Sequence, residues 1–277
     1  MALTKKRGWS LGQVALDYEA QLLGLSREAA LTEMIRRFEI MKECVAVGLE
    51  EEKNHMQLLE PTAGKISTAE AEKKLAIGGL HTRAAFRAMA AMHQNNSMGV
   101  VCAAPTGGSA GVLPGVVSTL VEEKNLSMKE AAMSLFAAAA IGLILARRAT
   151  FAAEVAGCQV EIGAAGAMAA AAVVEVAGGS AADAADAAAI AFQNTMGSVC
   201  DLVQGMCEIP CHTRNAVAAS SAFVCADLIL GGYVNPIPLD ETIDAVYSVG
   251  KMLPPELRCT ALGGLAVTPS ALSLKKR

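Results

Sequence analysis

The chain has 277 residues, enough for one large domain or two small ones and for a substantial buried core. Its net charge is −4 and no basic block is longer than Lys5–Arg7 or Lys275–Arg277, which argues against binding to nucleic acid. Hydrophobic residues make up 53% of the chain but aromatic residues only 4%. This composition predicts an all-α fold with small-residue helix contacts, because a β-sandwich requires more aromatic and β-branched side chains.

The N-terminal section is predicted to be helical and amphipathic over residues 1–62. Apolar residues recur there at helical spacing, and one face carries Leu31, Met34, Ile35, Phe38 and Met41. A boundary is expected near residues 61–64, followed by a helical core over 63–277, the two sections forming one continuous domain. Within that core, the sequence from Ser67 to Glu70 predicts a helix start, and the helical pattern continues from 69 to 93.

A change of character follows at VVCAAPTGGSAGVLPG, residues 100–115, which predicts a loop with exposed backbone amides. The patterns beyond it predict three buried helices over 126–149, 162–177 and 181–192, the last begun by Ser180. Breaks are expected around 194–197 and 231–238, where asparagine, glycine and proline gather.

The mean hydropathy of +0.39 raises the possibility of a membrane protein. The apolar run without charge at residues 131–146 has only 16 residues, seven of them alanine, whereas a membrane-spanning helix needs about 20 apolar residues. Buried core helices are therefore the better interpretation. The N-terminus lacks an apolar signal core, so a cytoplasmic location is expected, where eight cysteines would not form a disulfide framework.

Several common catalytic motifs are absent: GxxxxGK[ST], GxGxxG, HExxH and GxSxG. No lysine occurs from Glu130 to Gly250, which argues against a pyridoxal phosphate (PLP) Schiff base in the core. The four histidines are scattered and predict capped or surface side chains. His212 is the exception, because it follows Cys211 directly.

The segment CDLVQGMCEIPCHTRN, residues 200–215, holds three cysteines within twelve residues. Cys44, Cys102 and Cys225 lie among apolar residues and are interpreted as small buried hydrophobes. Other cysteines lie near glycines or turns: Cys158 in EVAGCQVEIG, and Cys200 and Cys211 around Gly205 and Pro210. No CxxC occurs, so spacing alone leaves a soft-metal or iron–sulfur site and plain core thiols both open.

Four segments are long and distinctive: NNSMGVVCAAPTGGSAGVLPG, AEVAGCQVEIGAAGAMAAAAVVEVAGG, CDLVQGMCEIPCHTRNA and IDAVYSVGKMLPPELRCTALGGLAVTPSA. They resemble the α chain of the iron–sulfur-dependent bacterial L-serine dehydratases, over about residues 10–270. The resemblance implies a [4Fe–4S] cluster held by Cys158, Cys200 and Cys211, with one iron left open. It also implies that Cys207, Cys259 and His212 are not ligands.

The resemblance implies the conversion of L-serine to pyruvate and ammonia by an oxygen-sensitive enzyme. An open iron suits this chemistry, because a Lewis acid can take up the charge that develops on the departing hydroxyl oxygen. Members of the family can carry a β chain with an SSHT motif whose histidine is a reasonable base. No SSHT occurs here, so a β subunit of L-serine dehydratase is the expected partner in an αβ assembly.

The serine carboxylate needs hydrogen-bond donors, and two polar turns are candidates for them. The predicted substrate-binding residues are Asn96, Ser97, Thr106, Gly107, Gly108, Ser109 and Arg214. Ordinary turn chemistry is an alternative for Thr106 and Ser109, and a structural ion pair for Arg214. A cysteine desulfidase on the same scaffold, a non-catalytic iron–sulfur sensor and a small membrane protein stay open as alternative functions.

Overall fold

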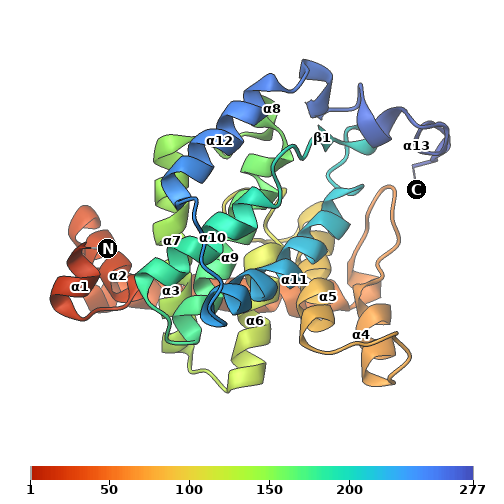
Figure 1. Cartoon of the computed structure of the whole chain (residues 1–277). Helices are drawn as coiled ribbons and strands as arrows, with labels where there is room; N and C mark the ends of the chain where they lie inside the picture. The colour runs from red at the N-terminus through yellow and green to blue at the C-terminus, as the bar shows by residue number, and fades with distance from the viewer. Residues whose placement is uncertain (1, 277) are drawn as a thin grey trace.

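The computed structural model describes residues 2–276 and has a helical bundle around one central helix, as the composition predicts (Figure 1). The α-helices are α1 (Ala2–Arg7), α2 (Leu11–Leu23), α3 (Arg27–Leu49), α4 (Ala63–Ala71), α5 (Leu80–Asn96), α6 (Val112–Lys124), α7 (Met128–Arg148), α8 (Ala153–Ala156), α9 (Ile162–Val176), α10 (Ala181–Gln193), α11 (Cys211–Leu230), α12 (Leu239–Met252) and α13 (Pro269–Ser273). Short 3₁₀ helices are η1 (Glu51–Lys53), η2 (Cys158–Val160), η3 (Val203–Gly205), η4 (Pro255–Leu257) and η5 (Gly264–Val267). Two strands, β1 (Cys200–Asp201) and β2 (Arg258–Thr260), pair in parallel.

Helix α9 is the central element. Every residue from Ile162 to Val174 is buried, and most of them are alanine or glycine. The helix packs against α6, α7, α10 and α11. Because alanine and glycine side chains are so small, neighbouring helix axes can approach closely and still leave few voids. The predicted buried helix over 162–177 is confirmed.

Two helices, at Met128–Arg148 and over residues 158–176, are long and apolar enough to cross a membrane by length and composition alone. Of the second window 83% is buried inside the molecule, and of the first 56%. The core helix of a bundle meets the same criterion of length and composition. The position of α9 among four helices accounts for its apolar sequence.

Serine N-caps begin α7 and α10, two of the helices that pack against α9. Ser127 and Ser180 each accept a hydrogen bond from the backbone three residues on, and Glu130 and Asp183 bond back to the cap residue. These capping boxes satisfy amide groups that would otherwise lack partners at the helix start. The predicted start of α10 at Ser180 is thereby confirmed, and α7 begins two residues after the predicted start at 126.

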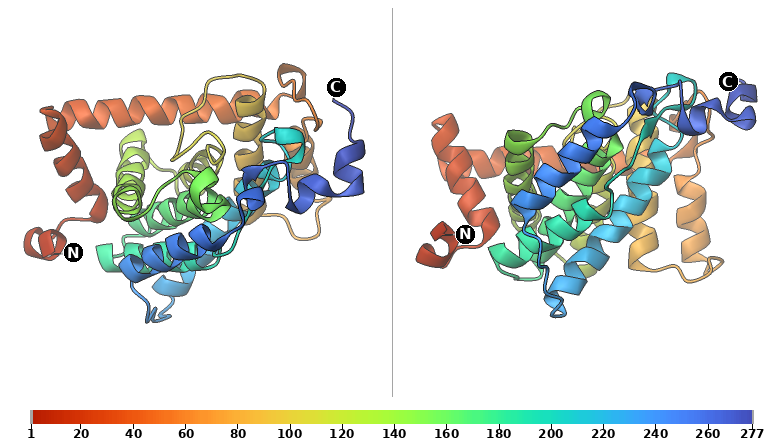
Figure 2. Two further views of the ribbon diagram at one scale, coloured as in Figure 1. Left: turned by 90° about the horizontal axis from the view of Figure 1, so that it is seen from above. Right: turned by 45° about the horizontal axis from the view of Figure 1, so that its top comes forward.

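The long helix α3 runs along one edge of the molecule and contacts α5, α6 and α7 (Figure 2, left). Its predicted apolar face points inward: Phe38 and Met41 are buried, and the other three members are half-buried. The two chain ends lie at opposite ends of the molecule, with α1 and α2 at one and α13 at the other (Figure 2). The residues 54–60, just after α3, reach the α13 end.

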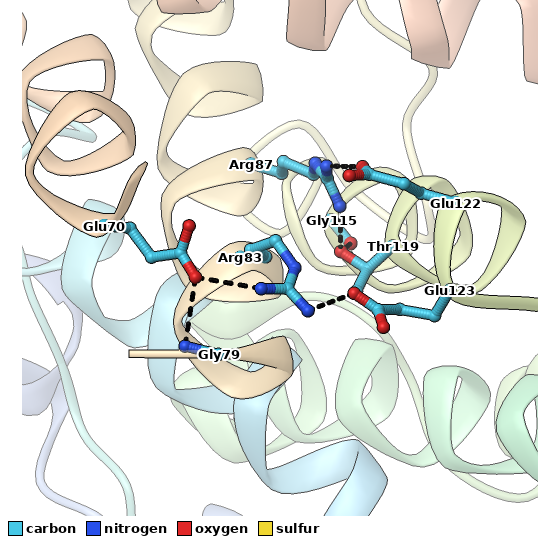
Figure 3. Close-up of polar contacts among 8 residues, drawn as sticks. All are labelled: Glu70, Gly79, Arg83, Arg87, Gly115, Thr119, Glu122 and Glu123. Carbon is cyan, nitrogen blue, oxygen red and sulfur yellow. Dashed lines mark hydrogen bonds and ion pairs between the residues drawn. The ribbon is translucent and has the colours of Figure 1, made fainter. Parts of the chain in front are cut away.

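The helix start predicted at Ser67 is wrong. Residues 67–70 lie in the last turns of α4, which begins at Ala63, and the next helix begins only at Leu80. The Glu70 carboxylate accepts hydrogen bonds from the Gly79 amide at 3.1 Å and from Arg83 at 2.8 Å (Figure 3). Tertiary pairing to α5 therefore uses the acidic side chain that the sequence pattern assigned to a cap.

Arginines on α5 link it to α6 as well (Figure 3). Arg83 also pairs with Glu123, while Arg87 pairs with Glu122 and donates a hydrogen bond to Thr119 at 2.7 Å. Ion pairs at a partly exposed surface contribute little individually. This network fixes the relative position of α4, α5 and α6 mainly by its geometry.

The predicted loop over 100–115 ends earlier than expected, because α6 begins at Val112. Pro114 lies in the first turn of this helix, where its missing amide hydrogen would have no intrahelical partner in any case. The residues from Ser109 to Val112 are buried, so the prediction of exposed amides is wrong for this end of the segment. The rest of the loop, residues 97–111, faces the cysteines described below.

Candidate metal centre

A left-handed turn positions Cys158. Gly157 has φ +76°, and a side-chain carbon there would lie 2.7 Å from both the Ser198 carbonyl oxygen and Leu253. Glycine is therefore required twice, by backbone conformation and by space. The turn places Cys158 at the first position of η2, where only 1% of its surface is exposed.

The small parallel sheet positions Cys200. Strand β1 pairs with β2 through Cys200 and Arg258, and the pairing places the thiol of Cys200 in hydrogen-bonding contact with both Cys158 and Cys259. These three cysteines come from segments about 40 to 100 residues apart in the sequence. The sequence pattern predicted no strand, because a two-residue strand has no periodicity to detect.

Cys211 is the first residue of α11, directly after the cis peptide bond between Ile209 and Pro210. Its thiol is buried and hydrogen-bonded to that of Cys207. The charges of Cys158 and Glu161 act on it, which shows that all three belong to one electrostatic environment. The first amides of a 20-residue helix favour an anionic sulfur at this position.

Glu161 is a further member of the cluster that the sequence analysis missed. One of its carboxylate oxygens and the sulfur atoms of Cys158 and Cys200 all lie within 4.8 Å of one another. Glu161 is the one charged residue between Glu154 and Glu175, in the run that leads into the most apolar helix of the chain. A charge at such a position is the sequence signal that could have identified it.

The thiols differ in acidity. The pKa of Cys158 is lowered, first by the hydrogen bond from Cys200 and then by the Arg214 guanidinium. The pKa of Cys200 is raised by donating that bond and by burial, and the pKa of Cys211 is raised by its bond with Cys207 and by burial. Cys158 is therefore the most acidic thiol of the three, and a bound cation would favour loss of the proton from the other two.

Arg214 joins the cysteines to the sheet. Its guanidinium donates to the Val199 carbonyl at 2.8 Å and to Asp201 at 2.9 Å, beside its contact with Cys158. The second oxygen of Asp201 accepts from the Leu265 amide at 2.7 Å. The structural ion pair considered for Arg214 is present, and substrate contact by this residue stays a prediction.

The predicted substrate loop lies against Glu161. Thr106 donates a hydrogen bond of 2.5 Å to the Glu161 carboxylate and shares another of 2.9 Å with Ser109. A side-chain carbon at Gly108 would lie 2.5 Å from the same Glu161 oxygen, whereas Gly107 is exposed and open. The turn Thr106–Ser109 therefore borders the cysteines through Glu161.

Asn96 and Ser97 lie on the Cys207 side of the site. The Asn96 amide nitrogen donates to the Cys207 carbonyl at 2.7 Å and contacts Nε2 of His212 at 2.6 Å. Ser97 accepts a hydrogen bond from the His55 amide at 2.8 Å. Both side chains have protein partners, and their predicted role in substrate binding is untested.

Cys44 and Cys225 are buried among apolar side chains, and burial raises the pKa of Cys44 to about 12 and that of Cys225 to about 11. The prediction that they are packing residues fits this environment.

A cavity of about 520 Å³ between α2, α3 and α7 is lined by Trp9, Met34 and Phe136. None of the cysteines in the described part of the chain lines this cavity, so it is separate from the cysteine site.

The donor set suits a soft metal or an iron–sulfur cluster. Buried cysteine sulfurs are the ligands that such groups prefer, and here two of them, from Cys158 and Cys200, converge with the Glu161 carboxylate from two separate segments. Arg214 offsets negative charge on one side of the set. The residues present therefore fit the cluster that the resemblance implies.

Comparison with known proteins agrees with this resemblance. The family model described as "Serine dehydratase alpha chain" matches residues 6–266. The chain is 38% identical over 275 residues to the "Probable L-serine dehydratase, alpha chain" of Bacillus subtilis, covering 99% of this chain and 92% of that protein. It is 46% identical over 188 residues to the protein of the same name from Latilactobacillus sakei, covering 68% of this chain and 90% of that protein. It is 36% identical over 182 residues to the L-serine dehydratase TdcG of Escherichia coli, covering 65% of this chain but 40% of that protein.

Proposed function

The chain belongs to the serine dehydratase alpha chain family, and on this premise we propose that it is the α chain of an L-serine dehydratase. The reaction removes water from L-serine and yields pyruvate and ammonia. The observation that carries the proposal is the convergence of Cys158, Cys200 and Glu161, with Cys211 in the same electrostatic environment, inside the segment that matches the family.

We propose that Cys158, Cys200 and Cys211 hold a [4Fe–4S] cluster. When bound, the cluster supplies a Lewis acid to the β-hydroxyl of serine, whose departure as hydroxide is otherwise difficult. Cys158 is ready for this role as the most acidic thiol of the set. Cys207 and Cys259 contact Cys211 and Cys200, and as hydrogen-bond partners they would tune the ligands rather than replace them.

The turn from Thr106 to Ser109 is the proposed site for the serine carboxylate. It borders Glu161, and its Gly107 is exposed and free of a side chain. Backbone amides of such a turn can donate to an anion. Asn96, Ser97 and Arg214 complete the proposed set; Arg214 would act partly through Cys158 and Asp201, which it already contacts.

A β subunit is the proposed partner. The two alpha chains from Bacillus subtilis and Latilactobacillus sakei match over about nine-tenths of their length, whereas the Escherichia coli L-serine dehydratase has a larger part outside the match. The two buried histidines of this chain, His93 and His212, have lowered pKa values because of burial, and neither is placed to collect protons from solvent. We therefore assign the general base to the β subunit, and we expect the assembly in the cytoplasm.

The experiment is anaerobic. The chain is purified together with a β chain from the same source, and pyruvate release from L-serine is measured beside the iron and sulfide content. Four irons per chain with turnover that air abolishes would support an iron–sulfur dehydratase. Faster pyruvate formation from L-cysteine than from L-serine would instead indicate a desulfidase, and iron without turnover would indicate a sensor. A chain without iron would refute the cluster.

A further inference from the structure

The half-buried carboxylate of Glu161 lies beside two of the cysteine thiols. Its oxygen lies within 4.8 Å of the sulfur atoms of both Cys158 and Cys200. Three donor atoms this close to one another are spaced to bind one metal ion, since metal–sulfur and metal–oxygen bonds are about 2.0 to 2.3 Å long.

The surroundings hold this carboxylate in place. Thr106 donates a hydrogen bond to one oxygen at 2.5 Å, and Gly108 leaves the space that this oxygen occupies, since a side-chain carbon there would lie 2.5 Å away. Within residues 2–276, no other side chain donates a hydrogen bond to this carboxylate. One oxygen is thus oriented by the loop, and the other is free for a ligand.

Burial raises the pKa of the Glu161 carboxyl, and no cationic side chain of the described residues is paired with it. No lysine or arginine of residues 2–276 forms an ion pair with Glu161, and the nearby guanidinium of Arg214 is directed to Asp201, the Val199 carbonyl and Cys158. A charged carboxylate in a partly buried site is unfavourable unless a cation offsets it. A metal ion bound by the carboxylate and by the two neighbouring sulfur atoms would supply that positive charge.

We propose that Glu161 is a protein ligand of the metal centre, joining Cys158 and Cys200, and that Thr106 is its positioning residue. The inference rests on the proposed metal centre and deepens it. A cluster held by three cysteines would leave one iron without a protein ligand, and Glu161 is the oxygen donor that we assign to it in the absence of substrate. Carboxylates bind iron more weakly than thiolates, which suits a ligand that must leave.

The test uses Co²⁺ as a probe on the full-length, metal-free, reduced chain, so that it does not depend on cluster assembly or on turnover. Thiolate–Co²⁺ charge-transfer absorption measures binding. We compare wild type with Glu161→Gln and use Glu154→Gln as the matched control, because Glu154 is an exposed acid on the same segment. Glu161→Gln should weaken Co²⁺ binding about tenfold or more, since even residues that only support a ligand contribute about 10- to 100-fold. Glu154→Gln should remain within about twofold of wild type.

A second variant guards against a local folding defect. Glu161→Cys replaces the oxygen ligand by sulfur, so it should restore Co²⁺ binding and increase the charge-transfer absorption by one further thiolate. Absorption equal to that of wild type in Glu161→Cys, or wild-type affinity in Glu161→Gln, would overturn the proposal. So would a Glu161→Gln enzyme that binds metal normally but needs far more L-serine, since Glu161 would then contact the substrate ammonium group.

The experiments distinguish a failure of the proposed dehydratase activity from a failure of the ligand assignment. If the αβ enzyme releases no pyruvate from L-serine but Co²⁺ affinity still depends on Glu161, the ligand assignment holds and the dehydratase assignment fails. In the loaded protein, loss of the exposed iron gives a three-iron cluster that electron paramagnetic resonance detects. This loss should be faster in Glu161→Gln than in wild type and unchanged in Glu154→Gln.

Discussion

The imidazole rings of His93 and His212 lie 5.2 Å apart, centroid to centroid, and His212 directly follows Cys211 in the chain. His93 bonds through Nδ1 to the Gly48 carbonyl, which can only accept, so Nδ1 carries the proton and Nε2 is bare. His212 accepts from the Asn96 amide through Nε2, so its proton is on Nδ1. The bare Nε2 of His93 and the protonated Nδ1 of His212 have no hydrogen-bond partner within residues 2–276, and both rings are neutral in the fold.

This pairing predicts a loss of stability in acid. Burial lowers the pKa of both histidines, that of His212 to about 3, whereas an unfolded histidine titrates near about 6.5. Below about pH 6.5 the unfolded chain binds protons that the folded chain does not, so the free energy of unfolding falls as the pH drops. For His212 this loss continues down to about pH 3.

We expect His93→Gln, which keeps a donor for Gly48, to flatten this dependence. Between pH 7 and pH 5 its unfolding free energy should fall by less than that of wild type, by up to about 2 kcal/mol. Urea denaturation at each pH measures the difference. His55→Gln removes an exposed histidine and should leave the slope unchanged. Equal slopes in His93→Gln and wild type would show that His93 has the same pKa in the folded and the unfolded chain.

A second prediction concerns Glu208, whose buried carboxylate accepts hydrogen bonds from three consecutive amides, those of Gln57, Leu58 and Leu59, at 2.7 to 2.8 Å. It joins the segment after α3 to the turn that carries Cys207 and Cys211. Glu208→Ala leaves these amides without their acceptor, and at about 1 to 3 kcal/mol each the unfolding free energy should fall by at least about 3 kcal/mol. Denaturant titration measures it.

Gln57→Ala is the control for Glu208, because its side chain is exposed while its amide still reaches the carboxylate. Its unfolding free energy should stay within about 0.5 kcal/mol of wild type. A Glu208→Ala protein as stable as this control would mean that water replaces the carboxylate at the three amides.

A third prediction separates ligands from their neighbours. Replacement of Cys158, Cys200 or Cys211 by alanine should each remove most of the iron from anaerobically purified protein. Cys207→Ala should retain it, because Cys207 only accepts the hydrogen bond that raises the pKa of Cys211. Iron content per chain is the measurement, with Cys225→Ala as a packing control from the same helix as Cys211. Normal iron in any of the first three variants would contradict the ligand assignment.

The sequence allowed the helices around α9 to be predicted, because alanine-rich periodicity and serine capping boxes are local signals. The helix start predicted at Ser67 was wrong, because Glu70 accepts its hydrogen bond from Arg83 of α5 rather than capping a helix. A local sequence pattern cannot reveal such a tertiary contact. The three cysteines came from family resemblance. Their meeting depends on the left-handed turn at Gly157 and on a two-residue strand, neither of which has a sequence period.

Glu161 was missed for the same reason: its relation to Cys200 and Thr106 exists only after folding. Charge within an apolar run is the local sign of such a residue, and in this chain it points to the metal centre. Of the adjacent glycines, Gly108 lies against the Glu161 carboxylate whereas Gly107 does not, so the same substitution at the two positions should have different effects.

Gly108→Ala should disturb the metal site more than the fold. The added carbon would lie 2.5 Å from a Glu161 carboxylate oxygen, so that oxygen must move. Because this oxygen is the end of a flexible side chain, the unfolding free energy should change by less than about 1 kcal/mol. Affinity for Co²⁺ should nevertheless fall toward that of Glu161→Gln. At Gly107 the nearest atom, an Asn95 oxygen, is 3.6 Å away, so Gly107→Ala should keep both stability and Co²⁺ affinity. Displacement of a metal ligand weakens binding. Wild-type Co²⁺ affinity in Gly108→Ala would therefore contradict the assignment of Glu161 as a ligand.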